Sequence, residues 1–186
     1  MKPKLIIVEG SQGCYKSTIT NILREQLPST TLLRLSGVKG RLKEDEVKSY
    51  IYHTNVLNLV LDTSSVGMNY VFDRSFMSDK VFANLKYKEY DFNFFYSALL
   101  SKLEFLQKKY DVYFILLVAD KDDFAERLKR NKAEYHEFSA QNSLMQQKQY
   151  LKEFHKIQGI DNKFIINTSL KSSDEVALDI MNKILN

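Results

Sequence analysis

The stretch Lys4–Thr18, KLIIVEGSQGCYKST, combines residue types and a spacing that suit the binding of a phosphate chain. It begins with a short apolar run without polar alternation, which predicts a buried strand. A loop with Gly10 and Gly13 follows, and Lys16 and Ser17 then open a predicted helix. The spacing from Gly10 to Ser17 is that of a P-loop, G-x-x-x-x-G-K-[ST], in the strand-loop-helix context that the motif needs.

Each residue type in this stretch has a physical reason. Glycines let a phosphate chain lie against bare backbone, and the free N–H groups at a helix start attract an anion. Lys16 is expected to meet the β- and γ-phosphates of a nucleotide, and the Ser17 hydroxyl is placed to ligate Mg²⁺. The sequence therefore predicts ATP and Mg²⁺ as cofactors. The residues expected to hold ATP are Gly10, Ser11, Gln12, Gly13, Cys14, Tyr15, Lys16, Ser17 and Thr18.

One position departs from the motif, because Tyr15 replaces the glycine that precedes the lysine. Its backbone N–H remains available, but a left-handed φ at this position would cost free energy and a bulky ring must be accommodated. The alternative interpretation is a glycine-rich turn between any strand and helix. Other parts of the chain must decide between the two.

The elements that would position these residues alternate between strand and helix along the whole chain. Such alternation predicts an α/β fold in which helices cover both faces of a parallel sheet. Ligands bind such sheets at the carboxyl ends of the strands, so the residues directly after each strand are the candidate site. The expected strands are residues 5–8, 31–35, 70–72, 112–118 and 163–167, and the expected helices are residues 17–27, 43–61, 78–85, 92–109, 122–129, 142–157 and a last one capped by residues 172–175.

Composition agrees with a single globular domain over residues 1–186, since 44% of the residues are hydrophobic and 27% are charged. No apolar run reaches transmembrane length, no signal peptide is recognised, and Cys14 is the only cysteine. These features predict a cytoplasmic protein without a membrane partner. A net charge of +4 suits a polyanionic small molecule and is too mild to argue for nucleic acid.

A second motif is Asp73-Arg74, which follows a buried strand at residues 70–72. Asp73 is a candidate to hold Mg²⁺ opposite Ser17, directly or through water. Arg74 is a candidate to clamp a phosphate, because its planar fork matches phosphate oxygens. The alternative is an aspartate that caps the next helix with an arginine paired to it.

A third motif carries Arg127 and Arg130, which lie three residues apart and therefore on one face of the predicted helix at 122–129 and its end. The polar segment that follows, approximately residues 130–142, is typical of a lid that closes over phosphates. Both arginines are then expected to stabilise transition-state charge. The alternative is an exposed helix face with solvated cations.

Together, VEGSQGCYKST, YVFDRSFMSDKVFA and FILLVADKDDFAERLKRNK resemble the thymidylate kinase and deoxynucleoside kinase superfamily, and the resemblance covers nearly the whole chain. It implies a three-layer α/β/α P-loop kinase fold with a five-stranded parallel sheet and a short lid. It also implies MgATP as phosphoryl donor and a deoxynucleoside or its monophosphate as acceptor. By this resemblance the catalytic residues are Lys16, Asp73, Arg74, Arg127 and Arg130.

The acceptor is indicated by an absence. Deoxynucleoside kinases of that superfamily usually carry an acid just after the second strand as a base for the 5′-hydroxyl, and residues 33–37 contain none. A monophosphate acceptor needs cations instead, and Arg34 and Arg41 are near. Phe76 is expected to stack on the base. We therefore predict a deoxynucleoside monophosphate that is bound by Arg34, Arg41, Arg74 and Phe76.

Three alternatives stay open. The motif around Asp73 also resembles the deoxynucleoside kinases, which would make a 5′-hydroxyl the acceptor. A polynucleotide-end kinase would want a stronger basic groove, and a non-catalytic nucleotide-binding module is supported by Tyr15 alone. The histidines show no metal-ligand spacing and are expected to be surface or satisfied residues. The oligomeric state is also open, a homodimer included.

Overall fold

The structure is a computed structural model, and it describes residues 2–36, 38, 40–130 and 139–185. Five strands and seven α-helices follow one another in the described chain, with one 3₁₀ helix. They are β1 (Lys4–Gly10), α1 (Lys16–Gln26), β2 (Thr30–Arg34), α2 (Asp45–Asp62), η1 (Ser64–Val66), β3 (Asn69–Asp73), α3 (Phe76–Asn84), α4 (Asn93–Leu106), β4 (Asp111–Val118), α5 (Lys121–Arg130), α6 (Ala140–Lys156), β5 (Asn162–Asn167) and α7 (Ser173–Leu185).

The five strands form one parallel sheet in the order β2-β3-β1-β4-β5, with β1 in the centre. Successive side chains of β1 point to opposite faces. Leu5 and Ile7 join one hydrophobic cluster, whereas Ile6 and Val8 join the other. Both faces of the central strand are therefore buried, which is why its sequence lacks polar alternation.

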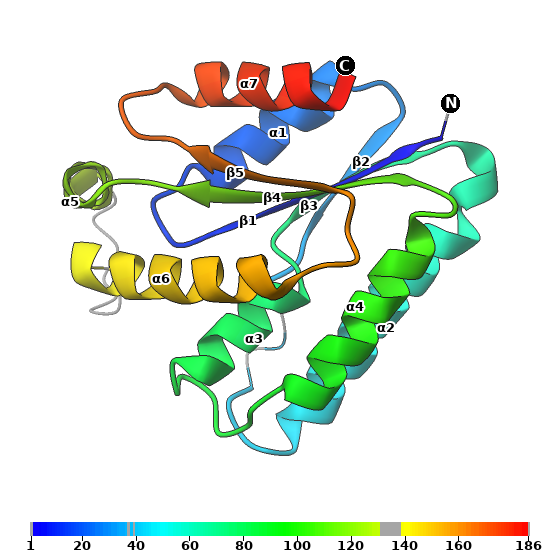
Figure 1. Ribbon diagram of the computed structural model, residues 1–186, viewed down its shortest axis with the longest axis horizontal. Helices are drawn as coiled ribbons and strands as arrows, with labels where there is room; N and C mark the ends of the chain where they lie inside the picture. Colours follow the sequence, from blue (N-terminus) through cyan, green and yellow to red (C-terminus); the bar gives the residue numbers. More distant parts are fainter. Residues whose placement is uncertain (1, 37, 39, 131–138, 186) are drawn as a thin grey trace.

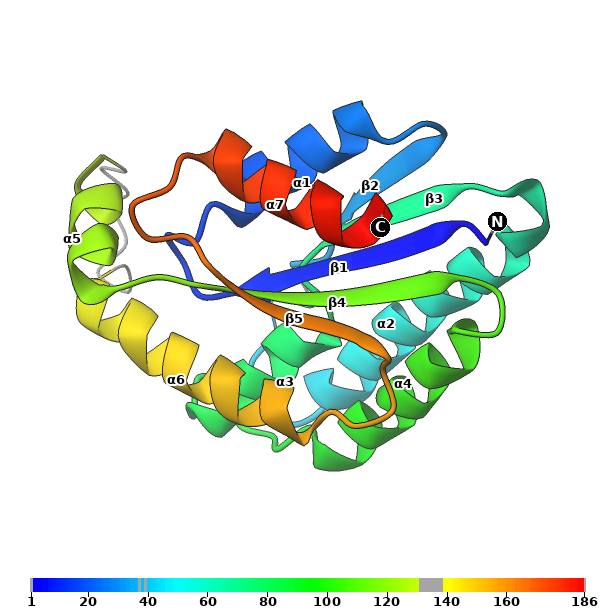
Figure 2. The same ribbon diagram turned by 45° about the horizontal axis from the view of Figure 1, so that its top comes forward.

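Helices cover both faces of the sheet, and this confirms the predicted three-layer architecture. Helices α1 and α7 lie on one face, whereas α2, α3, α4 and α6 lie on the other (Figures 1 and 2). The α1–α7 side holds Ile19, Val176 and Ile180, and the opposite cluster holds Leu99 and Phe154. Two separate apolar layers thus fix the sheet between the helices.

Local sequence signals set several helix ends. The hydroxyl of Ser75 accepts the N–H of Met77, so α3 begins at Phe76, two residues before the predicted start at residue 78. Ser172 and Glu175 form the predicted capping box before α7. The Ser172 N–H donates to Glu175 Oε2 at 2.7 Å, and the Glu175 N–H donates to Ser172 Oγ at 3.3 Å.

The carboxyl ends of the strands meet at one edge of the sheet, where α5 and the start of α6 also lie (Figure 1). The predicted lid, approximately residues 130–142, falls largely on residues 131–138, which lie outside the described residues. Within the described chain, no helix has the length and apolar character needed to cross a membrane.

Candidate active site at the carboxyl edge of the sheet

The loop between β1 and α1 requires glycine at two places. Gly10 has a φ of +146°, and a Cβ there would lie 2.5 Å from the carbonyl oxygen of Leu117 in β4. Gly13 has a φ of +82°, in the left-handed region that favours glycine. The loop therefore keeps bare backbone at the points where the motif predicts that phosphates approach.

Lys16 opens α1 and is buried, with its Nζ donating to the carbonyl oxygen of Ser11 at 2.6 Å. The pKa of Lys16 is lowered to about 8, first by burial and then by the nearby charge of Arg74, against the raising effects of Cys14, Asp73 and Glu9. A buried ammonium that is easily deprotonated gains strongly from an arriving anion. This is the property expected of a phosphate-binding lysine.

Tyr15 takes the left-handed backbone conformation of the glycine that it replaces, with a φ of 60°. Its ring packs beneath the guanidinium of Arg127, whose Cζ lies 3.9 Å from the ring centroid. Such a cation–π contact contributes roughly 0.5–2 kcal/mol, which is comparable with the roughly 1–2 kcal/mol of left-handed strain. The departure from the motif is thus compensated by a second residue.

Arg127 is buried and ties the loop to α5 and to the end of β5. Its Nη1 donates to the carbonyl oxygen of Gly13 at 3.0 Å and to Thr168 Oγ1 at 2.8 Å. Its Nη2 donates to the Thr168 carbonyl oxygen at 2.6 Å and to Asp123 Oδ1 at 3.3 Å. The guanidinium therefore holds the loop in this structure, and its action on transition-state charge stays a prediction. The side chain of Arg130 lies outside the described residues.

Ser17 and Asp73 come together as the sequence predicts. Ser17 Oγ donates to Asp73 Oδ2 at 2.6 Å, and the second carboxylate oxygen, Oδ1, is buried without a hydrogen-bond partner. A buried unpartnered carboxylate oxygen beside a hydroxyl fits a hard cation, because Mg²⁺ prefers oxygen ligands. Among the described residues there is no cluster of three or more His, Cys, Asp or Glu side chains of the kind that binds a metal without a nucleotide. Ser17 and Asp73 are thus the described residues that fit Mg²⁺ at this place.

A cavity of about 280 Å³ opens beside the loop, between Gln12, the β2–α2 connection, α3 and α6. The described residues that line it are Gln12, Ser36, Val38, Gly40, Arg41, Asp79, Phe82, Tyr87, Lys88, Asn142 and Gln146. It lies at the carboxyl edge of the sheet, next to the loop predicted to bind phosphates, and so forms the candidate acceptor site.

The predicted acceptor residues lie at different places relative to this cavity. Arg41 lines it, whereas Arg34 is exposed and donates to Asn21 Oδ1 at 2.9 Å. Phe76 is 1% exposed and packs edge-on against Tyr96 in the core, because the first turn of α3 faces inward. The aromatic rings on the cavity wall are instead those of Phe82 and Tyr87, at the end of α3 and just after it. Stacking of Phe76 on a base stays untested.

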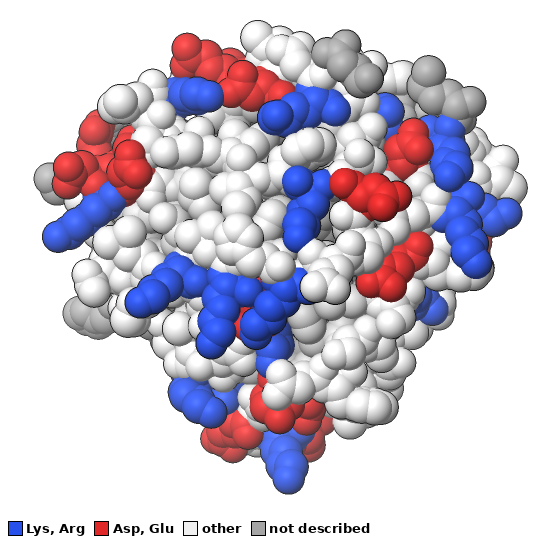
Figure 3. Space-filling view, in the orientation of Figure 1, with Lys and Arg blue, Asp and Glu red and all other residues white. Residues whose placement is uncertain are grey.

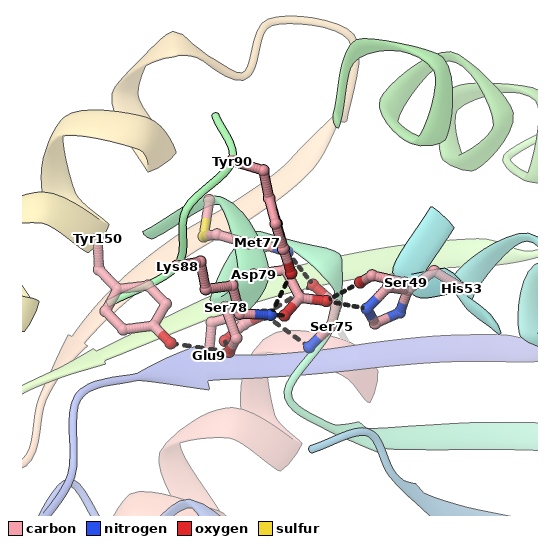
Figure 4. Close-up of polar contacts among 10 residues, drawn as sticks. All are labelled: Glu9, Ser49, His53, Ser75, Met77, Ser78, Asp79, Lys88, Tyr90 and Tyr150. Atoms are coloured by element: carbon pink, nitrogen blue, oxygen red, sulfur yellow. Dashed lines mark hydrogen bonds and ion pairs between the residues drawn. The ribbon is translucent and has the colours of Figure 1, made fainter. Parts of the chain in front are cut away.

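The only acid among the described lining residues, Asp79, is already fully engaged (Figure 4). Its Oδ2 accepts from Ser49 Oγ and lies 2.8 Å from His53 Nε2, and its Oδ1 is paired with the ammonium of Lys88. Burial raises the pKa of Asp79, but the hydrogen bond and charge of His53, together with Lys88, outweigh burial and lower it. This carboxylate is therefore a poor proton acceptor.

Comparisons with known proteins agree with this geometry. No family model and no curated protein matches the sequence. Solved structures do match. Thymidylate kinase from Candida albicans superposes with a TM-score of 0.70 at 16% identity, over 99% of this chain and 92% of that one. The chain has the P-loop kinase fold.

Two further structures share this kinase fold. The YorR protein of Bacillus subtilis, in complex with phosphorylated GDP, gives a TM-score of 0.69 at 20% identity, over 97% of this chain and 95% of that one. Deoxyadenosine kinase from M. mycoides with bound dATP gives 0.62 at 18% identity, over 98% of this chain and all of that one. At these identities the likeness concerns the fold, so the residues of this chain must carry the functional argument.

Sequence reasoning missed several buried polar residues of the kinase fold. Glu9 at the end of β1 accepts hydrogen bonds from Ser75 and Ser78, and Ser78 in turn meets Tyr150 of α6 (Figure 4). One signal was present in the sequence, since an acid in an otherwise apolar buried strand needs partners. No local signal pairs Asp79 with His53, because these residues lie 26 positions apart.

The strain at Tyr15 leads to a stability prediction. Tyr15→Ala keeps a Cβ in the left-handed backbone and loses the ring, whereas Tyr15→Gly loses the ring but relieves the strain. We expect urea unfolding to show Tyr15→Gly more stable than Tyr15→Ala by about 1 kcal/mol. Equal stability of the two variants would contradict a left-handed backbone imposed at this position.

The lowered pKa of Lys16 leads to a pH prediction for ATP binding. Phosphates favour the charged form of Lys16. At a pH at which Lys16 of the free protein is deprotonated, ATP binding must therefore be accompanied by the uptake of a proton. Above about pH 8 the calorimetric affinity for ATP should fall, by up to about tenfold per pH unit. Lys16→Arg is the control, since arginine stays charged and its profile should be flat. A flat wild-type profile from pH 7.5 to 9.5 would refute the assignment.

The unpartnered oxygen of Asp73 leads to a metal prediction. Mg²⁺ should strengthen ADP binding by the wild type, and Asp73→Asn should abolish most of that gain because the amide is a weaker ligand. In EDTA the variant should bind ADP at least as well as the wild type, since a negative charge near the phosphates is gone. An undiminished Mg²⁺ effect in Asp73→Asn, with the melting temperature lowered by many degrees, would favour the capping role instead.

Proposed function

We propose that this protein is a phosphotransferase that moves the γ-phosphoryl group of ATP, with Mg²⁺, to a deoxynucleoside monophosphate. The observation that carries the choice of acceptor is the charge of the cavity. Arg41 and Lys88 both line it with the one described acid, Asp79, which is paired with Lys88, so these three described side chains leave one net positive charge in the lining. Such a site favours an anionic acceptor.

The residues of the loop support the donor side of the reaction. Lys16 is placed to hold the β- and γ-phosphates, and Ser17 and Asp73 are placed to hold Mg²⁺ that arrives with them. When bound, Mg²⁺ would neutralise part of the negative charge of the phosphates. Arg74 lies near Lys16 of the loop and contacts Tyr150 of α6, and it is the candidate clamp for the transferred phosphoryl group. Arg127 and Arg130, which lie just before and at the start of the predicted lid, are the candidates to stabilise transition-state charge. All of these residues belong to the single predicted domain.

A deoxynucleoside kinase is the second candidate, and one observation favours it. A hydroxyl acceptor needs a general base, and the unpartnered Oδ1 of Asp73 is a carboxylate oxygen that remains available for that role. The same oxygen is the candidate Mg²⁺ ligand, so the two roles compete. Asp79 does not relieve this competition, because both of its oxygens are engaged.

The charge on one face of the molecule favours a small-molecule acceptor over a polynucleotide. On the face shown in Figure 3, acids and bases are mixed, and the basic side chains that gather there lie over α6, which exposes Lys148, Lys152 and Lys156. A polynucleotide-end kinase would need a continuous basic track leading into the cavity. A homodimer, which the sequence leaves open, would bury exposed apolar side chains on the neighbouring helices α2 and α4, among them Ile51 and Phe94.

The acceptor is tested by comparing dTMP with thymidine at equal concentration with MgATP. We expect faster phosphorylation of dTMP. Arg41→Ala should raise the KM for dTMP roughly 10- to 100-fold, the loss expected for charge-assisted hydrogen bonds, and leave the KM for ATP within about threefold. Arg24→Ala, which removes an exposed arginine of α1, is the matched control. Faster turnover of thymidine, with no effect of Arg41→Ala, would make this a deoxynucleoside kinase.

A further inference from the structure

Glu9 is a charged side chain that is completely buried under the candidate active site. Its Oε1 accepts from the backbone N–H of Ser75 at 2.6 Å and from Ser75 Oγ at 2.7 Å. Its Oε2 accepts from Ser78 Oγ at 2.9 Å. One oxygen is thus committed to the turn between β3 and α3, which contains Arg74, and the other to the first turn of α3.

Arg74 itself has a left-handed backbone, with a φ of 77°. For a non-glycine residue this conformation costs roughly 1–2 kcal/mol, so the surroundings must hold it. Two hydrogen bonds hold this conformation, one at Arg74 itself and one at the next residue. The Arg74 N–H donates to the carbonyl oxygen of Val8 at 3.0 Å, and the N–H of the next residue, Ser75, is held by Glu9. Consecutive residues of β1 therefore clamp the turn.

A chain of donors also joins the guanidinium of Arg74 to Glu9. Arg74 Nη1 donates to the Tyr150 hydroxyl at 3.5 Å, and that hydroxyl lies 2.8 Å from Ser78 Oγ. Because the single proton of Ser78 is donated to Glu9, Tyr150 must donate to Ser78. All bonds then run in one direction, from the guanidinium through two hydroxyls to the carboxylate. Figure 4 shows the contacts among Tyr150, Ser78 and Glu9.

The surroundings of Glu9 keep this chain intact at neutral pH. Burial raises the pKa of Glu9 to about 6, and the hydrogen bonds of Ser75 and Ser78 and the charges of Arg74 and Lys16 limit the rise. Burial and then the negative charge of Glu9 raise the pKa of the Tyr150 phenol. Burial, then the charge of Glu153 and then that of Glu9 raise the pKa of Tyr96. Glu9 is thus an acceptor for all of its partners.

We propose that Glu9 is a positioning residue for Arg74 in phosphoryl transfer: it fixes the backbone of Arg74 through Ser75 and holds the guanidinium against α6 through Ser78 and Tyr150. The inference rests on the proposed kinase function. Glu9 is not among the lining residues of the cavity, and its hydrogen bonds go to Ser75 and Ser78, so its effect on Arg74 passes through these two serines. Its charge also acts on Lys16, whose pKa it raises, and the Arg74→Ala background separates this second effect from the first.

The test is a double-mutant cycle of Glu9→Gln with Arg74→Ala. The amide of glutamine has nearly the same shape as the carboxylate of Glu9. Its NH₂ group, however, would face the hydrogen-bond donors of Ser75 or Ser78, which need an acceptor. Glu9→Gln should lower kcat about 10- to 100-fold, the scale of a misplaced transition-state group, with the KM for ATP changed less than about threefold. In the Arg74→Ala background it should cause no further loss of kcat. Glu153→Gln is the control, because Glu153 is also a buried glutamate, but it is bonded to Asn84, Gln149 and Lys156.

Independent losses that multiply in the double variant would overturn the proposal, as would a Glu9→Gln kcat within twofold of the wild type. If Glu9→Gln fails to fold, Ser78→Ala and Tyr150→Phe take its place, and each must lose its effect on kcat in the Arg74→Ala background. A wild type that phosphorylates no nucleoside or monophosphate would refute the proposed function instead. In that case the affinity for dTMP is measured for the same four proteins of the cycle. Additive changes in the free energy of dTMP binding would still refute the role of Glu9.

Discussion

A buried charge needs a compensating partner, and this constraint organises the whole carboxyl edge of the sheet. Isolated ions are costly to remove from water, whereas ions that are hydrogen-bonded or paired are tolerated. Glu9, Lys16, Asp73, Asp79 and Arg127 are all nearly inaccessible to solvent. Four of them have their polar atoms engaged by neighbouring groups. The exception is one oxygen of Asp73, Oδ1, which is buried without a hydrogen-bond partner and is the candidate ligand for a cation.

The same constraint explains how the chain tolerates Tyr15 in a loop that usually carries glycine. Arg127 makes four hydrogen bonds, to the loop, to α5 and to the residue after β5, and its flat guanidinium needs an apolar or aromatic surface on its face. The Tyr15 ring supplies that surface. Arg127, which is bonded to the loop, to α5 and to the residue after β5, thus packs on the Tyr15 ring and supports its left-handed backbone in the candidate phosphate-binding loop.

Much of the fold was predictable because its signals are local. The apolar runs identify the five strands, and the glycines, Lys16 and the Ser172–Glu175 capping box place helix starts within one or two residues. The pairing of Ser17 with Asp73 also followed, since both lie at carboxyl ends of strands or just after them. The residues that line the cavity were harder to predict from the sequence. Whether Phe76 or Phe82 faces a ligand depends on the rotation of α3, which its hydrophobic pattern alone leaves open, because nearly all of that helix is buried.

The first turn of α3 explains why these buried groups act together. Ser78 and Asp79 are neighbours in the chain, yet their side chains enter different networks (Figure 4). Ser78 belongs to the chain that ends at Arg74, and Asp79 holds Lys88 at the cavity wall and His53 on α2. Because both networks are satisfied and buried, the turn cannot shift without breaking hydrogen bonds on one side or the other. One rigid turn thus fixes the distance between the cations that line the cavity and the arginine beside the loop, and the phosphoryl transfer that we propose would depend on that distance.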